Sequence, residues 1–327
     1  MNSAIIQQLS AYLSATETRS GEAIGIALGC SRAAVWKHVE NLRGLGIEID
    51  AVAGQGYRLR EPLELLDRTR ILAVMDSAIS GKLRSLEIET SLDSTNAALR
   101  RLAVEDQHAA VIIAEHQSGG RGRRGRQWHS PYARNLYLSL GWMFEKALSE
   151  LGCLPLVVAL ATARALERAG LSGHRVKWPN DLTLDGRKLC GCLVEVQGDS
   201  QGPCHVVLGV GINVHMPVSA LTTGIDQPWT DLHSRLPDCS RNTLASLLLD
   251  ELVAGLELFA AHGFTPFGDA WERLDALRGQ VIEVFTANGT IHGMATGIDA
   301  SGALKLDTGR ELLTLHSGEV SLSKTKI

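Results

Sequence analysis

Long apolar runs, CxxC cysteine pairs and a strong excess of one charge are all missing from this 327-residue chain. The longest apolar run, Leu154–Ala161, is far shorter than the roughly 20 residues that cross a bilayer, so we expect no membrane span and no membrane partner. The N-terminus has no basic stretch followed by an apolar core, which predicts no secretory signal and a cytoplasmic protein.

Metal and disulfide patterns are also scarce. The six cysteines are scattered, no CxxC pair occurs, and only Cys190 and Cys192 lie close together. Free thiols in a reducing compartment are therefore favoured over a zinc site or a disulfide. The eleven histidines show no metal-ligand spacing, and no Walker A, kinase, GxSxG or HExxH motif occurs. A net charge of −4 means that any contact with nucleic acid must come from a local patch.

Residues 1–64 have the pattern of a small helical DNA-binding head. Apolar residues at helical spacing predict a first helix over Ile5–Leu13, and a second begins at Ser20. A Gly-containing break then precedes a third helix, Arg32–Arg43, for which Ser31 is a natural N-cap. A helix, a tight turn and a second helix with basic residues is the helix-turn-helix arrangement.

Two alternating runs, residues 47–52 and 57–60, surround a Gly-rich turn and predict a hairpin where a wing belongs. We expect Arg43 to face outward with the other basic residues of the third helix. The alternative is a packing module with a solvated charged face. DNA contacts are predicted at Ser31, Arg32, Ala33, Trp36 and Lys37.

Four arginines alternate with glycines in the segment Gly119–Trp128, between expected buried strands at 110–115 and 135–140. Glycine lets backbone N–H groups approach a ligand, and guanidinium groups suit phosphate or carboxylate. Like charges repel, so we expect this loop to be mobile until an anion orders it. A flexible RNA-binding Gly/Arg segment is the alternative, disfavoured because this one joins two core strands.

Three further clusters are polar or glycine-rich. Lysine, asparagine and aspartate occur in residues 177–182, after a likely strand start, and the hairpin signal Asp185-Gly186 returns the chain at Lys188. The apolar strand 206–214 has glycines at alternate positions, which predicts a face against which a flat ligand can lie. Residues 93–96, taken alone, predict a helix cap.

Four segments together resemble the biotin–protein ligase family in order and spacing: Gly120–Trp128, Lys177–Leu182, Lys188–Gly191 and Gly209–Asn213. With the head, the chain is similar to the bifunctional biotin ligase/biotin operon repressors over nearly its whole length. The resemblance implies a two-step reaction. Biotin attacks the α-phosphate of Mg-ATP to give biotinyl-5′-AMP and pyrophosphate. A lysine of the biotin carboxyl carrier protein of acetyl-CoA carboxylase then takes the biotinyl group, and AMP leaves.

The resemblance also implies roles for individual residues. Lys188 and Arg123 would be catalytic, with Lys188 neutralising charge on the phosphate, and Asp181 would help to hold Mg²⁺. Biotin contacts are implied at Ser94, Thr95, Asn96, Gln117, Arg121, Gly122, Arg123, Lys188, Gly191, Gly209 and Gly211. Nucleotide contacts are implied at Arg121, Arg124, Trp128, Lys177, Asn180 and Asn213.

The expected fold is α+β with three domains. A winged helix-turn-helix occupies 1–64, a mixed-sheet α/β catalytic domain of the biotin/lipoate ligase type occupies 65–276, and a small SH3-like β-barrel occupies 277–327. The barrel is predicted from short alternating runs at 281–284, 290–293, 304–306 and 312–315, with an Asn-Gly turn at 287–289.

As in such repressors, the adenylate is expected to act as corepressor, ordering the Arg-rich loop so that two subunits pair through the central sheet on biotin operator DNA. Competing readings are a metabolite-responsive repressor without chemistry and a monofunctional ligase whose head does not bind DNA. A lipoate-type ligase would leave the Gly/Arg loop unexplained. Residues Thr222–Arg241 carry no recognisable motif.

Overall fold

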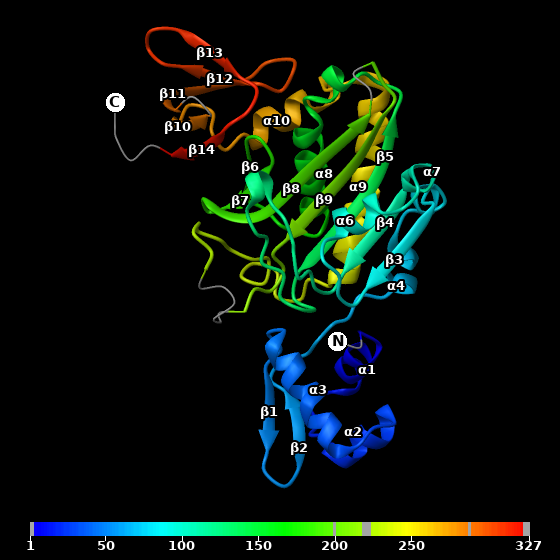
Figure 1. Ribbon diagram of the computed structural model, residues 1–327. Helices are drawn as coiled ribbons and strands as arrows, with labels where there is room; N and C mark the ends of the chain where they lie inside the picture. The colour runs from blue at the N-terminus through cyan, green and yellow to red at the C-terminus, as the bar shows by residue number, and fades with distance from the viewer. Residues whose placement is uncertain (1–2, 199–200, 218–223, 287–288, 323–327) are drawn as a thin grey trace.

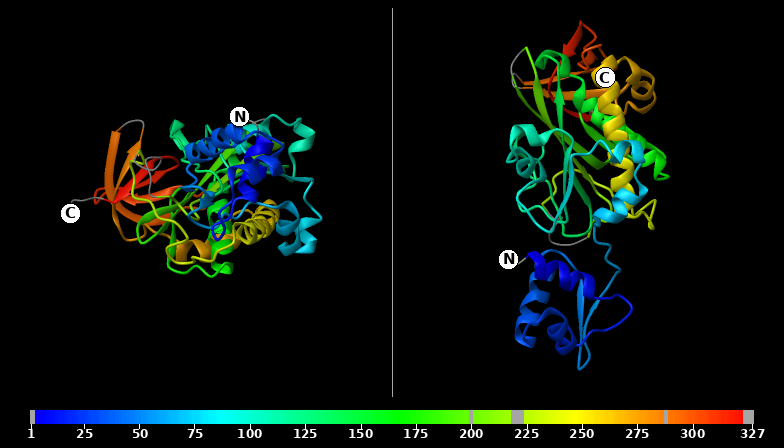
Figure 2. Two further views of the ribbon diagram at one scale, coloured as in Figure 1. Left: turned by 90° about the horizontal axis from the view of Figure 1, so that it is seen from below. Right: turned by 90° about the vertical axis from the view of Figure 1, so that its right-hand side faces the viewer.

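The computed structural model describes residues 3–198, 201–217, 224–286 and 289–322. The chain forms a small N-terminal head, a central sheet domain and a C-terminal sheet domain (Figure 1). A single extended stretch joins the head to the rest, and the side view separates the same parts (Figure 2).

The head contains the predicted three helices and hairpin: α1 (Ser3–Tyr12), α2 (Gly21–Leu28), α3 (Arg32–Gly44), β1 (Ile49–Val52) and β2 (Gly56–Leu59). Hydroxyl oxygens of Ser20 and Ser31 accept hydrogen bonds from the first turns of α2 and α3, so the predicted cap at Ser31 and the predicted helix start at Ser20 are confirmed. The turn between these helices uses Gly29 at φ 61°, a left-handed conformation that favours glycine. The head has its own apolar core, which Tyr132 and Ala133 of the central domain complete.

A seven-stranded mixed sheet forms the central domain in the order β3-β4-β5-β9-β8-β7-β6. Only β3 and β4 pair in parallel. The predicted strands before and after the Arg-rich loop, and the strand predicted to return at Lys188, are present. The strands are β3 (Ser85–Glu89), β4 (Ala110–Ala114), β5 (Leu136–Phe144), β6 (His174–Lys177), β7 (Asp181–Leu184), β8 (Arg187–Gly198) and β9 (Cys204–Ile212).

Two long helices, α8 (Leu154–Arg168) and α9 (Arg241–His262), pack on each other and cover one face of this sheet. The short helix α6 (Thr95–Arg100) packs on β4, β5 and β9 from the other face (Figures 1 and 2). The remaining helical segments are α4 (Arg68–Val74), α5 (Ser77–Ser80), α7 (Val104–Gln107), η1 (Arg123–Gly125), η2 (Leu148–Leu151), η4 (Thr265–Phe267) and α10 (Gly268–Leu274).

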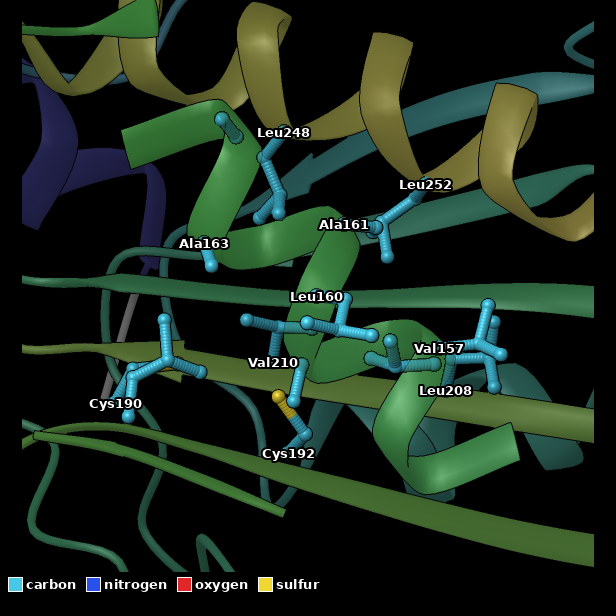
Figure 3. Close-up of a cluster of buried hydrophobic side chains, with 14 of the residues drawn as sticks. Val157, Leu160, Ala161, Ala163, Cys190, Cys192, Leu208, Val210, Leu248 and Leu252 are labelled. Atoms are coloured by element: carbon cyan, nitrogen blue, oxygen red, sulfur yellow. The ribbon is translucent and has the colours of Figure 1, made fainter. Parts of the chain in front are cut away.

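The core of the central domain lies between α8 and the sheet. Cys190 and Cys192 project toward α8 among Leu208, Val210 and Leu160 (Figure 3), so they act as small packing residues, as predicted. All six cysteines carry free thiols. These contacts bury the apolar side of β8 and leave its opposite side available to a ligand.

One helical stretch of the described chain, Leu148–Arg168, is long and apolar enough to cross a membrane by composition. Of its most apolar window, 67% is buried inside the protein, so it is the core helix of the central domain. Its apolar residues lie on the faces that meet the sheet and α9.

The C-terminal part is a five-stranded antiparallel sheet in the order β13-β12-β11-β10-β14. Its core is continuous with that of the central domain, and the indole N–H of Trp178 donates to the carbonyl of Gly302 at 2.9 Å. Residues 287 and 288 of the predicted turn lie outside the described residues. The strands are β10 (Val281–Thr286), β11 (Gly289–Ile298), β12 (Leu304–Asp307), β13 (Leu312–Leu315) and β14 (Glu319–Leu322).

Candidate active site

A cavity of about 1080 Å³, partly open to solvent, lies where the Arg-rich loop, the start of α6, and strands β7, β8 and β9 meet. The predicted site residues in its wall are Ser94, Thr95, Asn96, Gln117, Arg121, Gly122, Arg123, Arg124, Trp128, Lys177, Asn180, Asp181, Lys188, Gly191, Gly209 and Gly211.

Asn213 is the one predicted ligand contact that the cavity wall does not include. Its side-chain amide donates to the carbonyl of Thr230 at 3.0 Å, and the residue is buried. The carbonyl of Asn213 accepts from Leu232, and the backbone of Lys188 pairs with Thr230 at the same place. The structure therefore gives Asn213 a bracing role beneath the lysine rather than a direct place in the pocket.

The Arg-rich loop is a folded turn rather than a set of repelling charges. Its backbone closes through Gly122 N to the carbonyl of Arg126 at 2.7 Å. Glu319 of β14 forms ion pairs with Arg126 and, at 3.8 Å, with Arg124. The expectation of a self-repelling loop overlooked this carboxylate, whose one negative charge lies between two of the four arginines. All four arginines line the cavity.

The alternating glycines make room for protein side chains. Gly191 and Gly211 face each other across β8 and β9, and the indole of Trp128 lies over both. A Cβ atom at Gly211 would be 2.6 Å from Cε2 of Trp128, and one at Gly191 would be 3.0 Å from Cζ3. A Cβ at Gly209 would collide with the amide oxygen of Asn96. The idea that a flat ligand rests directly on this strand is corrected accordingly.

Two carboxylates lie among the cations of the cavity wall, Glu319 beside the loop arginines and Asp181 beside Lys188. Lys188 Nζ lies 2.8 Å from Asp181 Oδ2 and 5.5 Å from the Trp128 ring centre. Burial lowers the pKa of Lys177, with the nearby Lys188 charge adding to the effect and Asp181 opposing it. Burial also lowers the pKa of Arg123, whose guanidinium is 3.3 Å from the amide oxygen of Asn180. A bound anion would favour the charged form of both groups.

Another part of the cavity wall, around the start of α6, is polar and uncharged. Ser94 is the N-cap residue of α6 by position but makes no side-chain capping bond, so the cap reading of residues 93–96 is wrong. The backbone N–H of Thr95 donates instead to Gln117 Oε1 at 2.9 Å. Asp93 is held by two hydrogen bonds from Arg101, at 2.8 and 2.9 Å. Short hydroxyl and amide groups thus face the cavity from a rigid helix start.

Several wall residues escaped the sequence analysis. Gly318, Glu319 and Val320 come from β14 and its approach, and no strand was predicted there. Gln227 comes from the segment without a recognisable motif. Nothing in the sequence around Glu319 indicates that it pairs with Arg124, about 195 positions earlier in the chain. The contribution of β14 to the cavity wall is therefore visible only in the fold.

On the head, α3 presents the predicted DNA-contacting side chains to solvent. Trp36 is 58% exposed, and Arg32 and Lys37 are exposed and form no ion pair with a described residue. Arg43 does not face outward freely, because its guanidinium donates to the carbonyl of Ile49 at 3.0 Å and ties α3 to the hairpin. The basic face of α3 is therefore narrower than predicted.

Comparison with known proteins assigns all three parts. Residues 89–213 match a model described as the Biotin/lipoate A/B protein ligase family, residues 4–58 match an HTH domain, and residues 279–323 match a Biotin protein ligase C terminal domain. The bifunctional ligase/repressor BirA of Escherichia coli (strain K12) is 39% identical over 315 residues, which cover 96% of each chain.

Two further similarities agree with this assignment. The protein of the same name from Bacillus subtilis (strain 168) is 32% identical over 305 residues, covering 93% of each chain. A structure titled as the biotin protein ligase from Aquifex aeolicus in complex with biotin and ATP superposes with a TM-score of 0.63 at 26% identity, covering 74% of this chain and 99% of that one.

Proposed function

This chain belongs to the biotin–protein ligase family, with both ligase and repressor function, and we propose that its cationic cavity joins biotin to AMP. The observation that carries this proposal is the convergence of Arg121, Arg123, Lys177 and Lys188 on one cavity, part of whose wall carries uncharged hydrogen-bonding groups. The uncharged part suits the ring of biotin, and the cationic part suits its carboxylate beside the phosphates of ATP.

We assign the residues of the cationic part as follows. The carboxylate oxygen of biotin attacks the α-phosphorus of ATP, and pyrophosphate leaves with the electrons of the broken P–O bond. Lys188 would hold the biotin carboxylate against the phosphate and offset the charge that develops on it. Arg123, steered by Asn180, would grip the phosphate from the loop side. Lys177 and Arg124 would meet the remaining phosphate oxygens, and Trp128 offers a ring face to the adenine.

Mg²⁺ is implied by the family, and the donors present fit it only in a limited sense. No cluster of three His, Cys, Asp or Glu side chains that could hold a metal occurs in the described chain. Asp181 supplies one carboxylate, which is already paired with Lys188. Mg²⁺ commonly binds through one or two carboxylates together with substrate phosphates and water, so Asp181 is proposed as a single protein ligand.

The second step that we propose transfers the biotinyl group to a lysine of the biotin carboxyl carrier protein. The carrier amine attacks the acyl carbon, a proton leaves the amine, and the C–O bond to AMP breaks. The cavity's opening to solvent would admit such a lysine. We place these reactions in the cytoplasm, where free thiols such as the six of this chain persist.

For the repressor function we propose that the adenylate drives pairing of two subunits through the central sheet, which places two heads on a two-fold operator. The edge strands of that sheet are β3 and β6. The adenylate would bind the guanidinium groups of the Arg-rich loop and stabilise its folded form. Gel filtration with biotin and ATP should show a shift toward the dimer, and an unchanged monomer peak would refute this coupling.

Transfer of radiolabelled biotin to a carrier domain tests the ligase assignment of the site. The wild-type chain should label the carrier only when ATP is present. Lys188→Ala and Arg123→Ala should each lower the rate by at least about 100-fold, as expected for loss of a charge-stabilising group. Lys82→Ala is the matched control, because this lysine pairs with Glu257 at the surface. Equal rates in all three variants would refute the residue assignment. Release of pyrophosphate by the wild type would exclude a central domain that only senses a ligand without chemistry.

A further inference from the structure

The helix α3 packs into the head through one face and leaves the other open. Val35, Val39 and Leu42 are fully buried in the head core. In three-helix DNA-binding heads, the last helix reads bases with side chains spaced i, i+3, i+4 and i+7 along one face. The exposed residues of α3 that have this spacing are Ala33, Trp36, Lys37 and Glu40. Glu40 is the only acidic residue of α3, so a carboxylate lies on the face that meets DNA.

The Glu40 carboxylate is held in place by an arginine that also binds the hairpin. Arg43 Nη1 donates to Glu40 Oε1 at 2.6 Å. Nε of the same guanidinium donates to the carbonyl of Ile49 at 3.0 Å, and Nη2 donates to that oxygen too. The Glu40 side chain is 42% exposed, and its Oε2 forms no hydrogen bond with any residue that the structure describes. One carboxylate oxygen is therefore fixed, and the other is open to a partner outside the chain.

A carboxylate in the major groove weakens DNA binding unless it accepts a hydrogen bond there, because the phosphates around it are negative and a desolvated charge needs a partner. The donors that base edges offer in this groove are N4 of cytosine and N6 of adenine. Adenine also presents the acceptor N7 beside N6, and a carboxylate, which only accepts, is repelled by N7. Cytosine presents a C–H group beside N4. The chemistry of Glu40 therefore selects cytosine.

We propose that Glu40 reads a cytosine of the operator, with Oε2 accepting a hydrogen bond from the N4 amino group in the major groove. Arg43 touches no base in this arrangement and acts as a positioning residue, because it holds Oε1 and so aims Oε2. Arg32 and Lys37 supply the positive charge that meets phosphates. Affinity and sequence preference thus come from different side chains of one helix. This role requires only the DNA-binding function of the head and is independent of the ligase chemistry in the cavity.

Selection of duplexes from a random pool tests whether Glu40 sets one position of the operator. The full chain, with biotin and ATP present, is compared with Glu40→Gln. The wild-type motif should contain a cytosine that the variant replaces with adenine, because a glutamine amide both accepts from N6 and donates to N7 of adenine. The rest of the motif should be the same for both chains. An identical motif from both chains, or a wild-type motif without a C·G pair, would overturn the proposal.

A modified base isolates the amino group itself. N4-methylcytosine still pairs with guanine but carries a methyl group in place of the N–H that faces the major groove. At the selected cytosine this change should weaken wild-type binding about tenfold, through loss of one base-specific contact. Glu40→Gln should bind the methylated and unmodified duplexes within about twofold of each other. Wild-type binding that is insensitive to N4-methylation at every cytosine of the motif would overturn the proposal, whether or not the variant folds.

The ratio of the affinities for the selected duplex and for a scrambled one separates base reading from a purely structural ion pair. Loss of a carboxylate from the head strengthens attraction to the phosphates of both duplexes alike, so a structural Glu40 would leave the ratio unchanged. Glu40→Gln should instead lower the ratio about tenfold. Glu17→Gln is the matched control, since Glu17 pairs with Arg19 at 2.8 Å outside α3, and its ratio should stay within about twofold of wild type. Equal ratios for the Glu17 and Glu40 variants would count against base reading.

A double-variant comparison tests the positioning role of Arg43. Arg43→Gln releases the carboxylate and should lower the ratio in the wild-type background. In the Glu40→Gln background the same change should alter the ratio by less than about twofold, because no carboxylate is left to position. An equal loss in both backgrounds would show that Arg43 acts independently of Glu40 and would overturn this part of the proposal.

Discussion

Replacing Gly211 by alanine should destabilise the chain because of one side chain, the indole of Trp128. The added Cβ would lie 2.6 Å from Cε2 and 2.8 Å from both Cζ2 and Nε1 of that ring. Ordinary carbon contacts are about 3.5–4.0 Å, so the ring must move by about 1 Å. Overpacking of this kind costs about 1–3 kcal/mol in the free energy of unfolding. Biotin KM should rise as well, since the displaced ring lines the cavity.

The effect of Gly211→Ala on the free energy of unfolding should change from destabilising to stabilising when the Trp128 ring is removed. In a Trp128→Ala background the Gly211→Ala change loses its three closest contacts, and alanine stiffens the unfolded chain, which stabilises by about 0.4–1 kcal/mol. Urea unfolding of the four chains measures this cycle directly. Gly268→Ala, where a Cβ meets nothing within 4 Å, is the control. An equal loss of unfolding free energy on Gly211→Ala in both backgrounds would refute the conclusion that Gly211 makes room for the Trp128 ring.

Three other predictions concern the core, the phosphate end and the head. Arg241 and Glu115 form a buried ion pair at 2.8 Å, so Arg241→Ala should lower the free energy of unfolding by about 3–5 kcal/mol; a loss below about 1 kcal/mol would contradict this. Burial lowers the pKa of Lys177, and the protonated lysine is the form that binds phosphate, so ATP affinity measured by calorimetry should fall as pH rises through that pKa. The Lys177→Arg variant stays charged and should lose this pH dependence. The same pH profile in the variant and the wild type would contradict the assignment of Lys177 to the phosphates. Arg32→Ala and Lys37→Ala should each weaken operator binding and reduce the slope of the logarithm of the binding constant against the logarithm of salt concentration by about 1, with ligase activity unchanged. Unaltered operator binding in both variants would favour a head that does not bind DNA.

The local features of this protein were predictable because each is encoded within a few consecutive residues. Ser20 and Ser31 precede helical patterns, and both cap helices in the structure. The Gly/Arg loop lies between two buried strands, as its flanking apolar runs indicate. Residues of the four motifs line one cavity, with Asn213 outside its wall.

The remaining features depend on contacts between distant segments. Alternating glycines indicated missing side chains on one face of β9, but the fold alone shows that Trp128 and Asn96 fill that space. The four loop arginines indicated repulsion, which Glu319 offsets from another domain. Asn213 belongs to a matching motif yet supports Lys188 from behind. None of these pairings leaves a periodic or spacing signal in the sequence.

Biotin-dependent exchange of labelled pyrophosphate into ATP, measured on the full chain, tests most directly whether the arginine loop and Lys188 act on one acyl phosphate. Exchange should require biotin, and Arg123→Ala and Lys188→Ala should each reduce it by about 100-fold or more, with the double variant falling well short of the product of the two losses. Exchange that proceeds without biotin, or that survives both substitutions at the wild-type rate, would contradict the shared site.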